Sequence, residues 1–135
     1  GVAIQFADRT MVTYHVLHGT QIEYHRADGK SFLWYPGNRR AVSANWEVRS
    51  GPTGKRICWQ YPSRSYNPVT RQSGGRFDCT DTDRYQRGVS HILVGDPFGL
   101  GTGSIPFQLG REKTTPIHLI RMMGGNPDTL VYERR

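Results

Sequence analysis

The chain has 135 residues, a formal net charge of +7 and a hydrophobic fraction of 36%. This length fits one domain that buries a core of its own, and the 16 Gly and 8 Pro favour strands and turns over a helical bundle. No apolar run is long enough for a membrane-spanning helix.

Residues 1–18 place apolar side chains at both helical and strand spacings, so we expect a short helix or an extended arm there. Short stretches of alternating polarity follow, separated by turn residues. In residues 27–29, Asp-Gly accepts the positive φ that a hairpin turn needs. The segment 62–75 is expected to form a long loop, and 81–85 a turn. The expected antiparallel strands are 20–26, 30–35, 41–49, 55–61, 76–80 and 88–94.

The two cysteines, Cys58 and Cys79, stand 21 residues apart. A disulfide that closes this loop would add roughly 3 kcal/mol by restricting the unfolded chain. Two buried free thiols are the alternative. The even count and the start at Gly1 without Met favour a disulfide and an oxidising compartment, periplasmic or extracellular, after removal of a signal peptide. Trimming for expression would leave the same start.

Beyond residue 94 the pattern changes to Gly and Pro punctuation with apolar residues at intervals. Residues 95–110 are expected to be an extended segment pinned to a surface, and 115–135 a tail with an apolar run over 117–123. This segment and tail would dock on the chain's own barrel or on a partner. The apolar anchors expected to dock are Phe98, Leu100, Ile105 and Phe107.

The predicted fold is therefore mainly β. We expect one domain over residues 1–135, with an antiparallel meander or small barrel over 19–94 and an irregular, Gly/Pro-rich C-terminal half.

Arginine supplies all the basic residues except three lysines. Guanidinium groups suit carboxylates, phosphates and aromatic faces, so the charge predicts an anionic partner; a solvated basic surface is the alternative. We expect an acidic protein surface first, a membrane-associated assembly or lipid second, and nucleic acid last. The arginines expected at this contact are Arg39, Arg40, Arg56, Arg64, Arg71 and Arg76.

Aromatic side chains on alternating strand positions favour a core or the lining of a cavity. The residues expected to line it are Trp34, Trp46, Trp59 and Tyr61. Interleaved with arginines on an open barrel, the same aromatics would instead bind single-stranded nucleic acid by stacking.

No catalytic motif stands in the context that its chemistry requires, so we expect neither an enzyme nor a bound cofactor. His15, His18 and His25 are close in sequence, and two of them could share a face and bind a metal ion. No carboxylate or thiol stands at a matching spacing, so ordinary surface histidines are the favoured interpretation and no metal site is predicted.

The order Trp46-Glu-Val-Arg, Arg56-Ile-Cys-Trp-Gln-Tyr and Cys79 resembles small secreted proteobacterial lipocalin-like domains of uncharacterised function. The resemblance covers about residues 19–79 and departs from the pattern at Ala44 and Asn45, where a glycine is usual. It implies a periplasmic, non-enzymatic fold that resembles half of a lipocalin barrel, and it carries no catalytic residues.

Two functions compete on these grounds. An accessory or structural subunit of a larger protein assembly would use the basic surface and the extended tail. A lipocalin-like carrier would hold a small lipophilic ligand among the tryptophans, and a single-stranded nucleic-acid-binding barrel is a third class. If the run 117–123 packs on the chain's own barrel, the carrier function is favoured. If the run projects outward, the subunit function is favoured.

Overall fold

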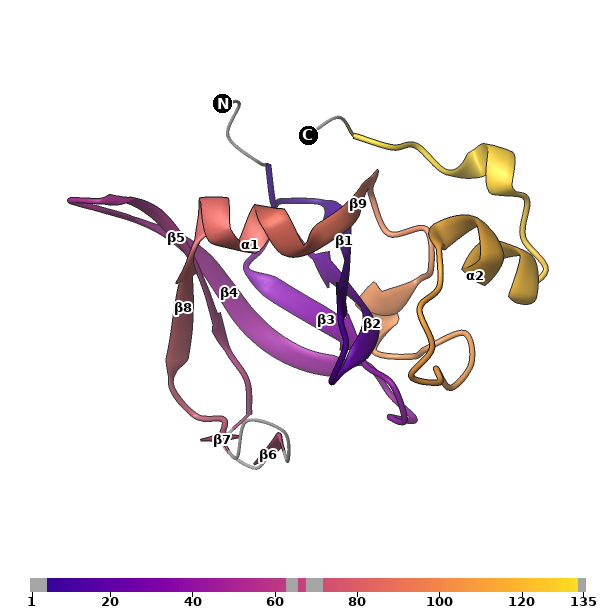
Figure 1. The fold of residues 1–135 in the computed structure, drawn as a ribbon, viewed down its shortest axis with the longest axis horizontal. Coiled ribbons are helices and arrows are strands. Elements are labelled where there is room, and N and C mark those ends of the chain that lie inside the picture. The colour runs from indigo at the N-terminus through magenta and orange to yellow at the C-terminus, as the bar shows by residue number, and fades with distance from the viewer. Residues whose placement is uncertain (1–4, 63–65, 68–71, 134–135) are drawn as a thin grey trace.

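The computed structural model describes residues 5–62, 66–67 and 72–133. It confirms the predicted mainly β architecture. A curled antiparallel sheet of seven strands, in the order β8-β5-β4-β3-β2-β1-β9, forms a half-barrel (Figure 1). Its strands are β1 (Arg9–His15), β2 (Gly19–His25), β3 (Lys30–Trp34), β4 (Val42–Gly51), β5 (Gly54–Gln60), β8 (Phe77–Asp81) and β9 (Val89–Val94).

Most of these strands lie where alternation and turn residues predicted them. The expected Asp-Gly turn joins β2 to β3, and Gly29 has the positive φ of 91° that the turn requires. The expected loop 62–75 contains a small hairpin of its own, formed by β6 (Tyr66–Asn67) and β7 (Gln72–Ser73).

The first strand corrects the expectation of a helix or arm over residues 1–18. β1 lies inside the sheet and pairs with both β2 and β9. Met11 and Val12 are fully buried on opposite faces, because both faces of the sheet are covered here. A strand buried on both faces need not alternate in polarity, and β1 places two apolar residues in succession, which explains the ambiguous pattern.

The expected turn at 81–85 is instead helix α1 (Thr82–Gly88). The Asp81 side chain caps it by accepting hydrogen bonds from the backbone N–H groups of Asp83 and Arg84. The helix connects β8 to β9, the two edge strands, and contacts β5, β8, β1 and β9. It therefore crosses the concave face and bridges the open side of the half-barrel (Figure 1).

The sheet separates two hydrophobic clusters. On the concave side, under α1, lies a cluster of Phe6, Met11, Ile57, Val89 and Ile92, packed against Trp46, Trp59 and Tyr85. On the convex side, β1, β2 and β3 contribute Val12, Ile22 and Trp34 to a larger cluster completed by the C-terminal half.

The apolar anchors of the C-terminal half dock on the chain's own sheet, not on a partner as the subunit hypothesis expected. Phe98 and Leu100 are buried in the convex cluster, and Ile105 and Phe107 pack against it. The Trp34 indole donates a hydrogen bond to the Phe107 carbonyl at 2.9 Å. The segment includes short helices η1 (Leu100–Thr102), α2 (Pro116–Met122) and η2 (Pro127–Thr129).

The predicted disulfide between Cys58 and Cys79 is present. The two residues are direct partners across β5 and β8, so the bond links the edge strand β8 to its neighbour β5.

Candidate functional site

A group of polar side chains lies buried on the concave face, under α1. Glu23 and His25 point there from β2, opposite Leu33 and Ser31 of β3. Tyr61 reaches them from the end of β5 and donates its hydroxyl to Glu23 Oε2 at 2.9 Å. We call Glu23, His25 and Tyr61 the buried polar cluster.

Small side chains make room for this contact. Ser31 pairs with Ala44 across β3 and β4, and Asn45 pairs with Gln60, so Tyr61 follows next to Ala44. Neither Ser31 nor Ala44 is large enough to block the phenol on its way to Glu23. The Tyr61 side chain, which follows β5, therefore reaches past β4 and β3 to contact Glu23 on β2.

Burial governs the electrostatics of this cluster. It raises the pKa of Glu23 to about 7, although the hydrogen bond from Tyr61 acts in the opposite direction. It lowers the pKa of His25 to about 3. The Trp59 indole donates to His25 Nε2 at 3.0 Å, which requires a neutral ring with that nitrogen unprotonated. Near neutral pH the cluster thus has a neutral imidazole beside a carboxyl group that can gain or lose a proton.

Aromatic rings surround the imidazole. Phe6, Trp46 and Trp59 have ring centroids 5.6, 5.3 and 5.8 Å from that of His25. His25 is fully buried and Glu23 is only 7% exposed. A general acid or base must reach its substrate, so the cluster in this closed form suits a role in stability better than one in catalysis.

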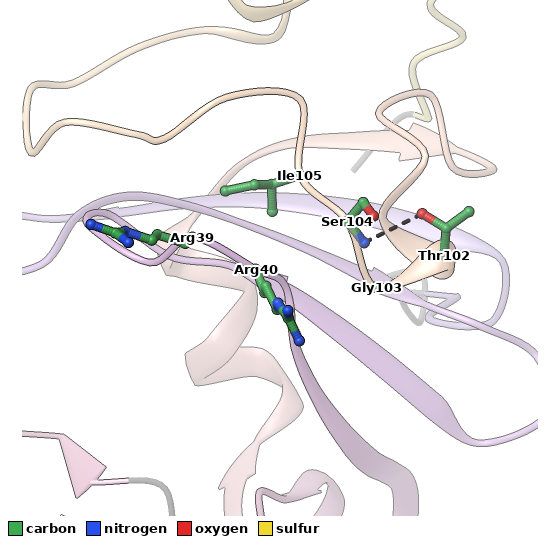
Figure 2. Close-up of a pocket in the computed structure, with 6 residues that line it drawn as sticks. All are labelled: Arg39, Arg40, Thr102, Gly103, Ser104 and Ile105. Carbon is green, nitrogen blue, oxygen red and sulfur yellow. Dashed lines mark hydrogen bonds between the residues drawn. The ribbon is translucent and has the colours of Figure 1, made fainter.

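Hollows open to solvent lie on the surface of the described part of the chain, and two of them are lined by polar side chains. The larger, about 520 Å³, lies between the β3–β4 connection and the loop after η1. Arg39 and Arg40 line one side and residues 102–105 the other, and the Ala41 N–H donates to the Gly103 carbonyl at 3.1 Å, which ties the walls together. The Ser104 N–H donates to Thr102 Oγ1, and the two arginine side chains point in different directions (Figure 2).

The second hollow, about 370 Å³, follows a polar row on the sheet. Lys30 Nζ donates to Asn45 Oδ1 at 2.8 Å, and Asn45 Nδ2 donates to Gln60 Oε1 at 2.9 Å. Tyr61 lines this hollow and also bonds Glu23. Tyr61 is therefore the residue that the surface hollow and the buried polar cluster share.

The predicted anionic-contact residues are only partly gathered. Arg39 and Arg40 share the larger hollow, whereas Arg56 lies near the other end of β4, on its partner strand. Arg76 is exposed just before β8. The remaining two, Arg64 and Arg71, lie outside the described residues.

The predicted cavity is divided by the sheet. Trp34 is fully buried on the convex side, while Trp46, Trp59 and Tyr61 lie on the concave side. The Trp46 indole donates to the Arg26 carbonyl at 2.9 Å. The tryptophans thus belong to two hydrophobic clusters and do not surround one shared space.

The three histidines also separate. His15 and His18 lie at the β1–β2 connection with ring centroids 5.2 Å apart, and His18 Nδ1 is 2.6 Å from the Tyr35 hydroxyl. His25 is at the other end of β2, opposite Arg9. Among the residues that the structure describes, no three metal-binding side chains come together.

Sequence reasoning interpreted His25 as an ordinary surface histidine and gave Glu23 no role, and so it missed the buried polar cluster. Their alternation with Ile22 and Tyr24 is that of a half-exposed strand. The helix α1 covers this face and changes their environment, and its first four residues were expected to belong to a turn over 81–85.

Comparisons with family models, curated proteins and solved structures give no significant match for this chain. The resemblance to small lipocalin-like domains therefore stays a prediction. Neither α1 nor α2 is long and apolar enough to cross a membrane, and the described residues contain no other α-helix.

Proposed function

We propose that this protein is a non-enzymatic accessory subunit of a larger protein assembly, and that it contacts an acidic surface of its partner through the β4–β5 hairpin. The outer part of that hairpin, residues 48–56, is called the arm below. Every residue of the arm is exposed. Figure 1 shows it projecting away from the body of the sheet.

The arm is open on both sides. Pairing of β3 with β4 ends at Asn45, and pairing of β5 with β8 begins at Arg56. Within the described chain, residues 48–51 of β4 therefore pair only with β5, and residues 54–55 of β5 only with β4. An isolated two-stranded ribbon is marginally stable in water, and its free edges and faces can be completed by another protein.

The charge of the arm supports an acidic partner. It carries Arg49, Lys55 and Arg56 and no acidic residue. Arg49 pairs with Glu47 at 3.2 Å, whereas Lys55 and Arg56 have no carboxylate within 4.0 Å in the described part of the chain. The observation that carries the proposal is this projecting, unpaired and basic ribbon.

Two other functions are less well supported. The tail packs on its own sheet, which counts for a carrier, but Trp46 and Trp59 fill the concave side instead of leaving a ligand cavity there. Stacking on single-stranded nucleic acid needs exposed aromatic faces, and Trp34 is fully buried. The disulfide fits an oxidising compartment, so the assembly is proposed to be periplasmic or extracellular.

Native mass spectrometry of the protein, isolated gently from its own source at low salt, tests the proposal. We expect partner chains to accompany the wild-type protein and to be lost from K55E/R56E. The control R84E/R87E changes the same charge on the exposed face of α1 and should keep them. Binding should weaken at high salt. A bound small molecule without partner chains would favour the carrier, and a bare wild-type monomer would overturn the proposal.

A further inference from the structure

One end of the sheet presents an apolar tip. The connection between β1 and β2, residues 16–18, exposes Val16 by 79% and Leu17 by 56%. The backbone N–H of Leu17 donates to His15 Nδ1 at 3.1 Å, and that of His18 to the His15 carbonyl at 3.0 Å. The two aliphatic side chains are thus held outward by an ordered turn.

The tip is anchored to the rest of the molecule. His18 Nδ1 is 2.6 Å from the Tyr35 hydroxyl, just after β3. The Thr114 N–H donates to Thr20 Oγ1 at 3.0 Å, which fixes the segment before α2 against the start of β2. A Cβ added to Gly19 would stand 2.7 Å from the Arg111 carbonyl oxygen, so that backbone lies directly on the hairpin.

Basic side chains surround this tip. Lys113 Nζ is 5.1 Å from the centroid of the Tyr14 ring, at the end of β1. Arg111 is close enough to His18 to contribute, after burial and His15, to lowering the pKa of that histidine. Glu112 stands between the two basic residues in the sequence, but neither has a carboxylate within 4.0 Å in the part of the chain that the structure describes.

The hollow of Arg39 and Arg40 belongs to the same end. Ile22 pairs with Trp34, and the two strands are antiparallel, so the β3–β4 connection lies at the end where β2 begins. The two connections are separated by two strand spacings, or about 10 Å. The hollow adds the hydroxyl groups of Thr102 and Ser104 to the two guanidinium groups.

We propose that this end of the molecule docks on an anionic lipid membrane. Val16 and Leu17 enter the boundary between headgroups and acyl chains, while Arg39, Arg40, Arg111 and Lys113 bind lipid phosphates. An exposed aliphatic tip inside a basic collar combines the two contributions that hold peripheral proteins on such membranes. A convex tip can enter a lipid surface without a matching pocket, and guanidinium and hydroxyl groups are donors suited to phosphate oxygens.

This inference goes beyond the proposed subunit function and does not depend on it. The arm lies past the far end of β4, whereas the tip and the hollow lie at the end where β4 begins. The two surfaces can therefore be occupied together, and each can be tested with the other unchanged.

Co-sedimentation with vesicles tests the membrane proposal. We expect the wild-type protein to bind phosphatidylcholine vesicles that contain phosphatidylglycerol, but not phosphatidylcholine alone. Each basic residue near an anionic surface contributes about fivefold in affinity, so R111E/K113E and R39E/R40E should each bind at least tenfold more weakly. We expect a loss of at least tenfold for V16D/L17D too, because it places two carboxylates where aliphatic side chains enter the lipid. The controls R84E/R87E and M122D/V131D change exposed residues elsewhere and should bind like the wild type.

Insertion of the tip needs its own readout. In L17W, the new indole should shift its emission to shorter wavelength on anionic vesicles, whereas that of M122W should not. Circular dichroism confirms that each variant is folded. The proposal is overturned if the wild type ignores anionic vesicles, if V16D/L17D binds them normally, or if the L17W emission does not move. A wild type that ignores vesicles but loses a protein partner in V16D/L17D would assign the tip to a protein pocket.

Discussion

Glu23 and His25 face the same buried space from alternate positions of β2, and burial opposes the charge of each. The carboxyl group keeps its proton up to about pH 7, and the imidazole loses its proton down to about pH 3. Their nearest atoms, Glu23 Oε1 and His25 Nε2, are 3.9 Å apart, too far for a hydrogen bond. Both groups are therefore uncharged over much of the acidic range, and no ion pair offsets their burial.

These opposite shifts predict an unusual dependence of stability on pH. Between about pH 4.5 and 7 the folded Glu23 holds a proton that the unfolded chain has released, so its contribution falls as the pH rises. Between about pH 3 and 6.5 the unfolded His25 holds a proton that the folded chain lacks, so its contribution rises with pH. The two slopes oppose each other where these ranges overlap.

Single variants should separate the pH dependence that Glu23 gives to the free energy of unfolding from the one that His25 gives. Urea unfolding at a series of pH values measures both. For E23Q we expect the free energy of unfolding to rise by about 4 kcal/mol from pH 3 to 6.5, and for H25Q to fall by about 3 kcal/mol from pH 4.5 to 7. The wild type should change little between pH 4.5 and 6.5. Two variants with the same slope as the wild type would contradict the assignment.

Gly19 shows how one residue can fix the contact between two segments. Its φ is 87°, and the Arg111 backbone lies where a side chain would begin. Gly37 has a similar φ of 85° but has nothing within 4 Å of an added Cβ. The pair therefore separates the cost of the backbone conformation from the cost of the contact.

We predict that G37A lowers the free energy of unfolding by about 1 kcal/mol, the cost of a left-handed L-residue. G19A should lower it by a further 1–3 kcal/mol or so, because the Arg111 backbone must move away. Chemical denaturation of both variants measures the difference. Equal losses in the two would mean that the segment before α2 does not press on the hairpin.

At the scale of elements, the edge strand β8 is held by three different restraints. Among the described strands it pairs only with β5, it is cross-linked to β5 through Cys58 and Cys79, and it continues into α1 through the Asp81 cap. Because α1 then crosses to β9, movement of β8 would disturb the cover of the concave face. The disulfide therefore supports the helix that buries Glu23 and His25.

Removal of the cross-link should cost about 3 kcal/mol, the value for a loop of this length. We expect C58A/C79A to remain folded but to unfold at lower urea concentration, and its β8 amides to exchange hydrogen faster than those of β2. Wild-type protein with its disulfide reduced is the control, and it should show the same loss of stability and the same faster exchange of the β8 amides as C58A/C79A. Unchanged stability in both would show that strand pairing alone holds this edge.

Strands whose polarity alternates were predictable, including β2, which is buried on both faces, and elements without that alternation were not. The strands β2 to β5 carry alternating polarity and are joined by turns with Gly or Pro. β1 lacks alternation because its consecutive residues Met11 and Val12 are both apolar and face opposite, covered sides of the sheet. α1 is a single short helix whose only local signal is Asp81 ahead of Asp83 and Arg84, and such a cap also occurs in turns.

The residues of the candidate sites also divide into those that the sequence pattern reveals and those that depend on the three-dimensional arrangement. Arg39 and Arg40 were predicted as contact residues because exposed charge can be read from composition. The contact of Tyr61 with Glu23 depends on the strand register and on the small side chain of Ala44 between them. The exposed tip at Val16 and Leu17 was hidden in a segment whose secondary structure was ambiguous.

At the scale of the whole molecule, the C-terminal half is a layer of the fold. It closes the convex face over β1, β2 and β3, and its last part pairs with β9, where the Val94 N–H donates to the Val131 carbonyl at 2.8 Å. The sheet thus has α1 on one side and residues 95–133 on the other. In this arrangement the arm and the tip extend beyond the layers.

If the C-terminal half is a layer of this core, its buried residues must contribute to global stability. Leu119 in α2 is 1% exposed, whereas Ile117 in the same helix is 41% exposed. We predict that L119A lowers the free energy of unfolding by about 2–4 kcal/mol and I117A by less than about 1 kcal/mol. Urea unfolding followed by tryptophan fluorescence measures both, since Trp34 lies beneath the C-terminal layer and Trp59 beneath α1. The L119A transition should stay single and shift as a whole. A separate early transition confined to the Trp34 environment would instead mean that the C-terminal half detaches on its own, as a tail docked on a partner would.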